Sequence, residues 1–383
     1  MMGPMNGGTI VPAGTGAAKG AACEPEGPTK ESFEREVLAH LREERLRRPK
    51  MGSQDAVKFV FQALLGVGHL LAAREAVTDR IAREMDGEEA DTAELLCEKL
   101  SPCWCRLNLR RAKAEQITPD VIAGLMLTSQ PAVRFMRKDV LEVIERTGQW
   151  LGDAVPDGLT PAPVLDESWL PSHSDAYRKA YRPAYRVISS DWLPYIGAVG
   201  EISRALRDKG RLLVTIDGPC ASGKTTFAQR VSEVFVAPVV HTDDFVVPHA
   251  GKTPERLAIP GGNCDAERLA NEVAEPWSRG ETVRIRKYDC GSDRFLPEET
   301  LPDSTVLIIE GCYCNLPALS RYAGVKLFVD APWEQREQRL MNRESPASMK
   351  MFYERWIPLE NAYFRAYGLP GEGIDLIVPQ QSV

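Results

Sequence analysis

The stretch Leu212–Val231, "LLVTIDGPCASGKTTFAQRV", places a glycine-rich turn between a short apolar run and a sequence typical of a helix. Within it, Gly218 to Thr225 match the pattern G-x-x-x-x-G-K-[ST]. The backbone N–H groups of such a loop curl around phosphate oxygens, and the helix that follows adds the positive end of its dipole. Because the strand before and the helix after are both present, the pattern predicts a nucleotide-phosphate site rather than a turn with a surface lysine.

Each position of this loop has a predicted part in the site. Lys224 is expected to reach the β- and γ-phosphates, and the Thr225 hydroxyl is expected to bind Mg²⁺. The rest of the predicted nucleotide-binding set is Gly218, Pro219, Cys220, Ala221, Ser222, Gly223 and Thr226. The expected cofactors are therefore ATP and Mg²⁺.

Short apolar, often β-branched runs recur after about residue 195. They are residues 211–216, 237–242, 282–288, 305–311, 325–330 and 374–379. Helical stretches separate most of them, which is the pattern of an α/β domain with a mainly parallel sheet and covering helices. We assign residues 191–383 to this P-loop domain.

Acidic residues stand where two of these runs end, which is where open parallel sheets place ligand groups. Asp243 and Asp244 follow one run, and an acid there either accepts a proton from an attacking hydroxyl, holds magnesium water or caps a helix. Adjacent residues of an extended chain point in opposite directions, so we expect only one of the two to face the phosphates. Glu310 ends another run and is the expected second acid beside the loop, unless it merely terminates a strand.

A predicted helix near residues 334–345 carries Arg336, Arg339 and Arg343, which are spaced three and four apart and so share one face. Such a face suits a lid that closes over a transferring phosphate. A solvated charged face is the alternative interpretation.

The C-terminal half, about residues 195–383, resembles the uridine kinase-like branch of P-loop kinases, which includes phosphoribulokinase and pantothenate kinase. The matching pieces follow the family's order and are "IDGPCASGKTT", "HTDDF", "GGNCDAERL", "RKYDCGSDR", "LIIEGCY" and the arginine-bearing segment. The resemblance implies an enzyme that transfers the γ-phosphoryl group of Mg-ATP to a hydroxyl of a small metabolite.

The resemblance also implies roles for single residues. Asp243 becomes the general base, Lys224, Arg339 and Arg343 the other catalytic groups, and Glu310 an acid beside the magnesium that Thr225 also binds. The implied substrate-side residues are Asp265, Tyr288, Asp293 and Arg336.

Asp293 marks a departure from the family. Uridine kinases carry a histidine near this place that helps recognise the pyrimidine, whereas an ionised aspartate accepts hydrogen bonds and donates none. We therefore expect an acceptor other than uridine or cytidine.

The N-terminal part carries no chemical motif. We expect a flexible tail over residues 1–28 and a mainly helical domain of unknown function, with a connector, over residues 29–190. Helical stretches are predicted at residues 91–100 and 139–151, and Pro102, Pro119 and Pro131 are expected helix starts or breaks. "FQALLGVGHLL" and "CRLNLRRA" resemble an uncharacterised bacterial helical family, which implies no function.

Two stretches of this part invite other interpretations. Residues 56–73 are apolar enough for a membrane span, but they contain Lys58, Gln62 and His69 and have charged flanks, so we expect a buried helix. Residues 173–187, "HSDAYRKAYRPAYRV", mix aromatic and basic side chains. That mixture binds phosphate or stacks on bases, or it packs one domain against the other, which we slightly favour.

Composition narrows the remaining choices. A chain of 383 residues with 43% hydrophobic and 26% charged residues favours two globular domains, and its net charge of −7 argues against a dedicated nucleic-acid binder. Nine cysteines lack the spacing of a disulfide framework or a zinc site, so Cys97, Cys103 and Cys105 are expected to be thiols, and a cytoplasmic location is expected. The expected partner is a small-molecule hydroxyl acceptor, without nucleic acid or membrane.

Two other functions stay open at this point. The P-loop domain could be a nucleotide-operated switch that regulates the helical domain without a diffusible acceptor. Alternatively, the helical domain could itself be a catalyst that supplies or consumes the product of the kinase domain.

Overall fold

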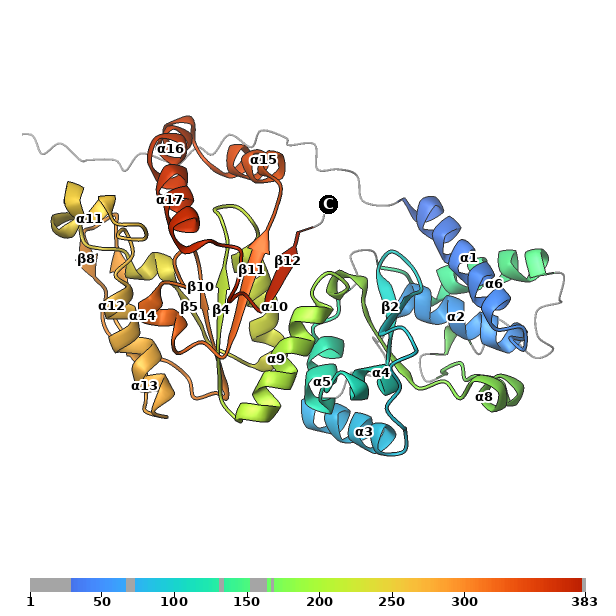
Figure 1. The fold of residues 1–383 in the computed structure, drawn as a ribbon. Coiled ribbons are helices and arrows are strands. Elements are labelled where there is room, and N and C mark those ends of the chain that lie inside the picture. Colours follow the sequence, from blue (N-terminus) through green and yellow to red (C-terminus); the bar gives the residue numbers. More distant parts are fainter. Residues whose placement is uncertain (1–28, 67–72, 131–133, 152–163, 167–168, 381–383) are drawn as a thin grey trace, which may run out of the picture.

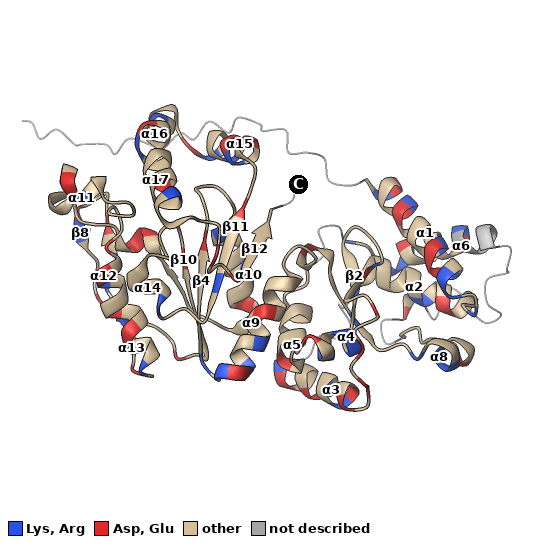
Figure 2. Ribbon diagram, in the orientation of Figure 1, with Lys and Arg blue, Asp and Glu red and all other residues tan. Residues whose placement is uncertain are grey.

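The computed structural model describes residues 29–66, 73–130, 134–151, 164–166 and 169–380. Figure 1 shows two parts side by side, a sheet surrounded by helices in the C-terminal half and a smaller, mainly helical part in the N-terminal half. The predicted tail and most of the predicted connector lie outside the described residues. Figure 2 shows acidic and basic residues spread together over the helices of both parts.

The C-terminal half is built on a five-stranded sheet in the order β12-β11-β4-β10-β5, in which every neighbouring pair is parallel. The strands are β4 (Leu212–Asp217), β5 (Val239–His241), β10 (Val306–Glu310), β11 (Val325–Asp330) and β12 (Leu376–Pro379). Alternate residues of β4 enter different cores, since Val214 packs in one buried cluster and Leu213 in another. Both faces are therefore covered, as the apolar runs predicted. The parallel sheet with its covering helices fits the α/β fold expected of a P-loop domain, which confirms the predicted fold class.

Helices cover both faces of this sheet and continue above the carboxyl ends of its strands (Figure 1). They are α9 (Ile196–Lys209), α10 (Lys224–Phe235), α11 (Pro254–Ala258), α12 (Ala266–Leu269), α13 (Glu275–Ser278), α14 (Pro317–Ser320), α15 (Trp333–Arg343), α16 (Pro346–Met351) and α17 (Ile357–Tyr367). The π-helical turns η4 (Ala270–Ala274) and η5 (Phe352–Trp356) join α12 to α13 and α16 to α17. The 3₁₀ turns are η1 (Ser190–Trp192), η2 (Thr242–Phe245) and η3 (His249–Gly251).

One predicted strand of the sheet is placed elsewhere. Residues 282–288 contribute to two small antiparallel pairs, β6 (Arg284–Ile285) with β9 (Glu299–Thr300) and β7 (Tyr288–Asp289) with β8 (Arg294–Phe295). The reason lies in the alternation of this run, because Ile285 is buried while Arg284 is exposed. A strand covered on both faces needs apolar side chains on both.

The N-terminal half is mainly helical, as predicted, but it also contains a three-stranded antiparallel sheet that we did not predict. The helices are α1 (Lys30–Arg47), α2 (Ser53–Leu65), α3 (Arg74–Asp86), α4 (Leu109–Ala114), α5 (Pro119–Leu127), α6 (Arg137–Leu151) and α8 (Asp175–Tyr181). The strands are β1 (Cys97–Lys99), β2 (Trp104–Asn108) and β3 (Tyr185–Ser189).

This sheet overturns the helix predicted over residues 91–100. Near the end of that stretch, residues 97–99 form β1, which pairs with β2 and places Cys97 opposite Leu107. Tertiary pairing therefore overrides the local helix propensity. Pro102 accordingly lies between β1 and β2, whereas Pro119 begins α5 behind a Thr118 cap. Pro131 lies outside the described residues, and α6 confirms the helix predicted over residues 139–151.

The predicted buried helix is α2, within which Phe59, Val60 and Phe61 are almost fully buried. The end of that prediction, residues 67–72, lies outside the described residues. None of the described helices combines the length and hydropathy that a membrane crossing requires. Cys105 in β2 and Cys103, just before that strand, are buried free thiols.

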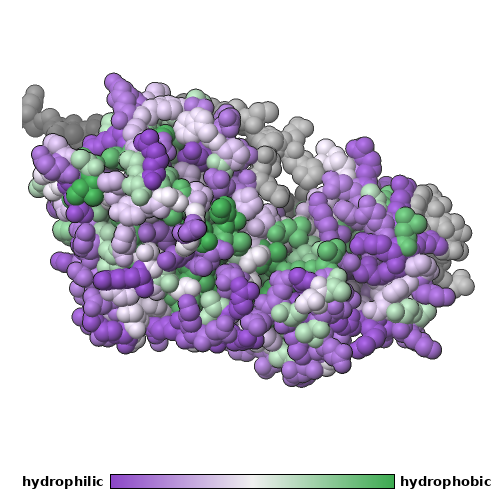
Figure 3. Space-filling model, viewed as in Figure 1, coloured by the Kyte–Doolittle hydropathy of each residue, from purple (hydrophilic) through white to green (hydrophobic). Residues whose placement is uncertain are grey.

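The two halves share one buried cluster, which runs from α1 and α2 to the face of the sheet that α9 and α10 cover. Helix α5 packs directly on α10, where a Cβ on Gly124 would lie 2.5 Å from the Val234 carbonyl oxygen. Arg74 of α3 donates to the same carbonyl at 2.6 Å. In Figure 3 the apolar residues visible on this face gather mainly where the two halves meet. The domain division at residue 190 stays a prediction.

Candidate active site

The phosphate loop joins the buried strand β4 to α10, as the sequence predicted. Gly218 has φ of 146°, and a Cβ there would lie 2.3 Å from the Val329 carbonyl oxygen of β11. Gly223 has φ of 98° where α10 begins. Both positions therefore require glycine, because a side chain would be strained in each and would collide with the neighbouring strand at the first.

A cavity of about 470 Å³ opens beside this loop. The loop and α10 contribute Lys224 and Thr225, and the segment after β5 contributes Asp243. Arg339 and Arg343 of α15 and Glu360 of α17 also line it. Its volume suits a small-molecule site.

Lys224 is half-buried and lines this cavity, and its Nζ donates to the Pro219 carbonyl at 3.2 Å. Burial disfavours the charged ammonium, but the carboxylates of Glu360, Glu310 and Asp243 outweigh it, so the pKa of Lys224 is raised. The loop therefore holds a permanent positive charge toward the cavity.

Thr225 and Glu310 form the second polar group of the site. The Thr225 hydroxyl donates to Glu310 Oε1 at 3.1 Å, and His241 Nδ1 contacts the same oxygen. The hydrogen bond that His241 donates to Glu310 raises the pKa of His241. The other carboxylate oxygen, Glu310 Oε2, is buried and has no hydrogen-bond partner among the described residues. A hydroxyl beside a buried carboxylate with an unsatisfied oxygen fits Mg²⁺, a hard cation that takes oxygen ligands.

Asp243 and Asp244 lie in the 3₁₀ turn η2, not in extended chain as we expected. The turn still separates them, because Asp243 lines the cavity whereas the Asp244 carboxylate lies 4.0 Å from Lys287 Nζ. Burial raises the pKa of Asp244. Only Asp243 therefore faces the phosphate loop.

The three predicted arginines all lie on α15, and two of them contact the phosphate loop. Arg336 Nη1 donates to the Cys220 carbonyl at 3.3 Å, and Arg339 Nη1 donates to the carbonyls of Ala221 at 3.0 Å and Ser222 at 3.2 Å. Arg343 lines the cavity and pairs with Glu344. The helix thus brings positive charge to the loop, with Arg339 closest to it.

Glu360 is the main site residue that sequence reasoning missed. Its side chain is buried on α17, and its Oε2 accepts the Cys220 backbone N–H at 2.9 Å. Burial raises the pKa of Glu360, although Lys224 and the Cys220 N–H oppose that shift. A carboxylate from a distant helix therefore occupies a backbone donor of the phosphate loop.

Other cavity residues carried no usable signal in the sequence. They are Val246, Lys252, Asn263, Cys290, Cys312, Tyr313, Phe352 and Trp356. Asn263 lies within a quoted motif, "GGNCDAERL", of which we selected the neighbouring aspartate instead.

The three remaining predicted substrate residues do not line this cavity in the structure. Asp265 caps α12 by accepting the Arg268 N–H at 3.2 Å. The Tyr288 hydroxyl donates to the Asp293 carboxylate and accepts the His249 N–H at 3.1 Å. All three residues make these contacts within the protein, and any direct substrate contact by them stays a prediction.

Asp217, at the end of β4, is a second unpredicted acid. Burial raises its pKa to about 6, although it accepts hydrogen bonds from the Gly218 N–H at 2.7 Å and the Tyr363 hydroxyl at 2.7 Å. Because Tyr363 belongs to α17, Asp217 ties the start of the loop to the helix that carries Glu360.

Comparison with known proteins finds solved structures of similar fold. One is a possible uridine kinase from Bacillus stearothermophilus, 21% identical, with a TM-score of 0.34 over 44% of this chain and 88% of that chain. Another is a putative fructose transport system kinase from Silicibacter sp. TM1040, 24% identical, with a TM-score of 0.38 over 46% of this chain and 95% of that chain. No family model and no curated protein sequence matches the chain.

Proposed function

We propose that the protein is an ATP- and Mg²⁺-dependent phosphotransferase whose acceptor is a hydroxyl of a small metabolite. One observation supports this best, namely that a single cavity is lined by the loop lysine, by Thr225 beside Glu310, by Asp243 and by two arginines. A binding switch would also need the phosphate loop, and the acid that faces the same space favours phosphoryl transfer because it can accept the proton of an acceptor hydroxyl.

Each side chain has a defined part in the proposed reaction. Asp243 accepts the proton of the acceptor hydroxyl as that oxygen attacks the γ-phosphorus, and the bond to the β–γ bridging oxygen breaks to release ADP. Lys224 and Arg339 stabilise the negative charge on the phosphoryl oxygens. Thr225 and Glu310 would hold Mg²⁺, which neutralises phosphate charge when it is bound.

The acceptor is proposed to be something other than uridine or cytidine. Asp293 is committed to Tyr288 and to the His249 N–H, so this place offers a pyrimidine carbonyl no donor from that side chain. Losing such a hydrogen bond lowers kcat/KM by roughly ten- to a hundredfold. Comparing kcat/KM for uridine and cytidine with sugars, vitamins and purine nucleosides tests this, and pyrimidine nucleosides in first place would refute it.

The proposed activity is tested by ADP release from Mg-ATP over the same panel of metabolites. Lys224→Ala should abolish acceptor-dependent release, whereas Lys350→Ala, which removes an exposed lysine of α16, should leave it unchanged. Stoichiometric ATP binding with no phosphorylated product from any metabolite would contradict the proposal and favour the regulatory switch.

A further inference from the structure

A second cavity lies in the N-terminal half and is formed mainly by α2, β3 and the segment around Pro171. Its volume is about 450 Å³, within the usual range for small-molecule sites. Its lining includes the apolar Phe61 and Leu109 and the polar side chains of Lys58, His173 and Tyr185. The lining also contains two carboxylates, Glu84 and Glu88, which form ion pairs with Arg186 and Arg110. The cavity shares no lining residue with the phosphate-loop site.

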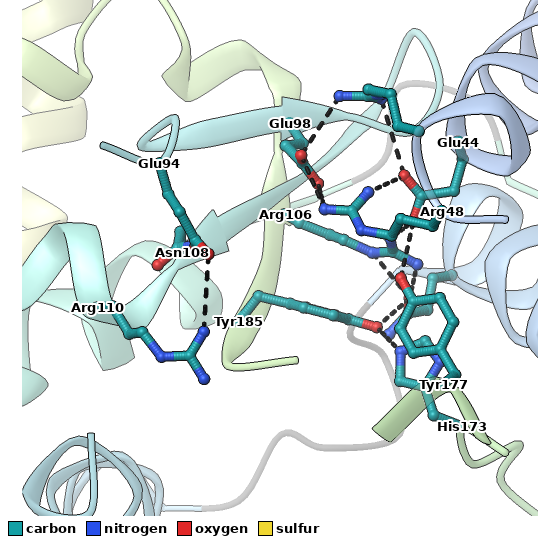
Figure 4. A network of polar contacts seen from close by, with 12 residues as sticks. Glu44, Arg48, Glu94, Glu98, Arg106, Asn108, Arg110, His173, Tyr177 and Tyr185 are labelled. Carbon is teal, nitrogen blue, oxygen red and sulfur yellow. Dashed lines mark hydrogen bonds and ion pairs between the residues drawn. The ribbon is translucent and has the colours of Figure 1, made fainter. Parts of the chain in front are cut away.

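Hydrogen bonds hold the polar residues of this cavity in one arrangement, and Figure 4 shows two of them, His173 and Tyr185, within a larger network of polar contacts. The buried Asp55 carboxylate accepts His173 Nδ1–H at 2.9 Å and the Ser174 backbone N–H at 2.9 Å. Burial lowers the pKa of His173, so its neutral ring leaves Nε2 as an acceptor, 2.6 Å from the Tyr185 hydroxyl. His173 and Tyr185 are therefore positioned before any ligand arrives.

The charges behind this wall are paired within the protein. Arg106 is buried, donates to Glu44 at 2.7 Å and lies with its guanidinium 4.4 Å from the centre of the Tyr185 ring. Tyr177 donates to the same carboxylate at 3.0 Å. Arg186, which lines the cavity, forms an ion pair with Glu84. These contacts also place the aromatic residues of 173–187 inside the N-terminal half, which corrects our expectation that they pack one domain against the other.

Lys58 differs from these cations. Its Nζ donates to the Pro171 carbonyl at 3.4 Å, and within the described part of the chain no carboxylate lies within ion-pair distance of it. Burial and the guanidinium groups of Arg106, Arg178 and Arg186 lower its pKa to about 8, and the Asp55 carboxylate opposes them. A partly dehydrated ammonium without a counter-ion is unfavourable, and a bound anion would relieve it.

We propose that this cavity binds a small organic anion whose carboxylate or phosphate group pairs with Lys58 and whose apolar part lies against Phe61 and Leu109. Because the Tyr185 hydroxyl is already donated to His173, Lys58 is the donor to the acidic group, and the His173–Tyr185 pair only shapes the wall beside it. This site is independent of the proposed phosphotransfer, because it uses no residue of the phosphate loop.

Calorimetric titration of the full chain tests the proposal. Every protein titrated carries Lys224→Ala, so that the phosphate loop does not contribute to anion binding. The probes are phenyl phosphate and benzoate, with benzyl alcohol as the uncharged match. We expect at least one anion to bind at millimolar concentration or below and benzyl alcohol to bind at least tenfold more weakly. The anion that binds more tightly shows whether the site prefers a carboxylate or a phosphate group. Lys58→Met should weaken anion binding at least tenfold, whereas Lys50→Met, at an exposed position, should not change it.

A proton measurement separates a charge contact from a merely structural effect of the substitution. At pH 8 roughly half of the Lys58 side chains are neutral, so anion binding should take up about half a proton, measured in two buffers of different ionisation enthalpy. Lys58→Arg should keep the binding and lose the proton uptake. The proposal is overturned if neither anion binds at millimolar concentration, or if both bind Lys58→Met as tightly as the unsubstituted cavity.

Discussion

Glu360 gives the sharpest test of the phosphate-loop site, because its carboxylate already holds the Cys220 N–H at 2.9 Å. A backbone donor of this loop is what a nucleotide phosphate needs, so binding must displace the carboxylate. A hydrogen bond to a charged group contributes about 1.5–3 kcal/mol and a neutral one about 0.5–1.5 kcal/mol. Glu360→Gln should therefore reduce the competition by about 1–1.5 kcal/mol and tighten ATP binding by roughly tenfold.

The same substitution should act in the opposite direction on the free protein. Glu360 offsets the buried charge of Lys224, so Glu360→Gln should lower the thermal midpoint without ATP and enlarge the rise that ATP produces. Calorimetric Kd values and thermal unfolding with and without Mg-ATP measure both effects. Glu354→Gln, at an exposed position beside α17, is the matched control. Unchanged or weaker ATP binding by Glu360→Gln would refute the reasoning.

Three further perturbations follow from the described contacts. Asp243→Asn should lower kcat by roughly 10²–10⁴-fold with ATP affinity little changed, whereas Asp244→Asn should keep most of the turnover, since only Asp243 faces the loop. Steady-state kinetics in which Asp244→Asn is the less active variant would exchange the roles of the two aspartates. Gly218→Ala should abolish ATP binding in titrations, because the added Cβ would lie 2.3 Å from a carbonyl oxygen of β11, and normal affinity would contradict the close approach. Lys58 binds its proton less tightly when folded, with a pKa of about 8 against 10.5 in the unfolded chain, so Lys58→Met should stabilise the protein by about 2–3 kcal/mol at pH 7. Urea unfolding should show this stability difference decreasing from pH 8 and disappearing near pH 10.5. A difference that does not depend on pH would refute the lowered pKa of Lys58 as its cause.

The sequence was sufficient for the parts of the site that depend on the backbone. Gly218 and Gly223 are required by positive φ and by a close neighbour, and such requirements leave a local signature together with Lys224. Asp243 and Glu310 were found because parallel strands deliver their carboxyl ends to one edge of the sheet.

The rest of the site depends on contacts between distant segments. Glu360 reaches Cys220 across 140 positions, and no motif around it announces that contact. Residues 282–288 and 91–100 were misassigned for a related reason, since their pairing partners, not their own composition, decide their structure. Lys58 was visible as a charge within an apolar segment, but the absence of a counter-ion around it appears only in three dimensions.

The contact between α5 and α10 has a mechanical consequence. The phosphate loop leads directly into the first residue of α10. Near the other end of this helix, the Val234 carbonyl packs closely against Gly124 and accepts a hydrogen bond from Arg74. A helix of 12 residues is a stiff rod about 18 Å long, so it carries a displacement from one end to the other with little loss. Any displacement of α10 by phosphate binding would therefore act on its contact with the N-terminal half, and the two effects would be equal in free energy.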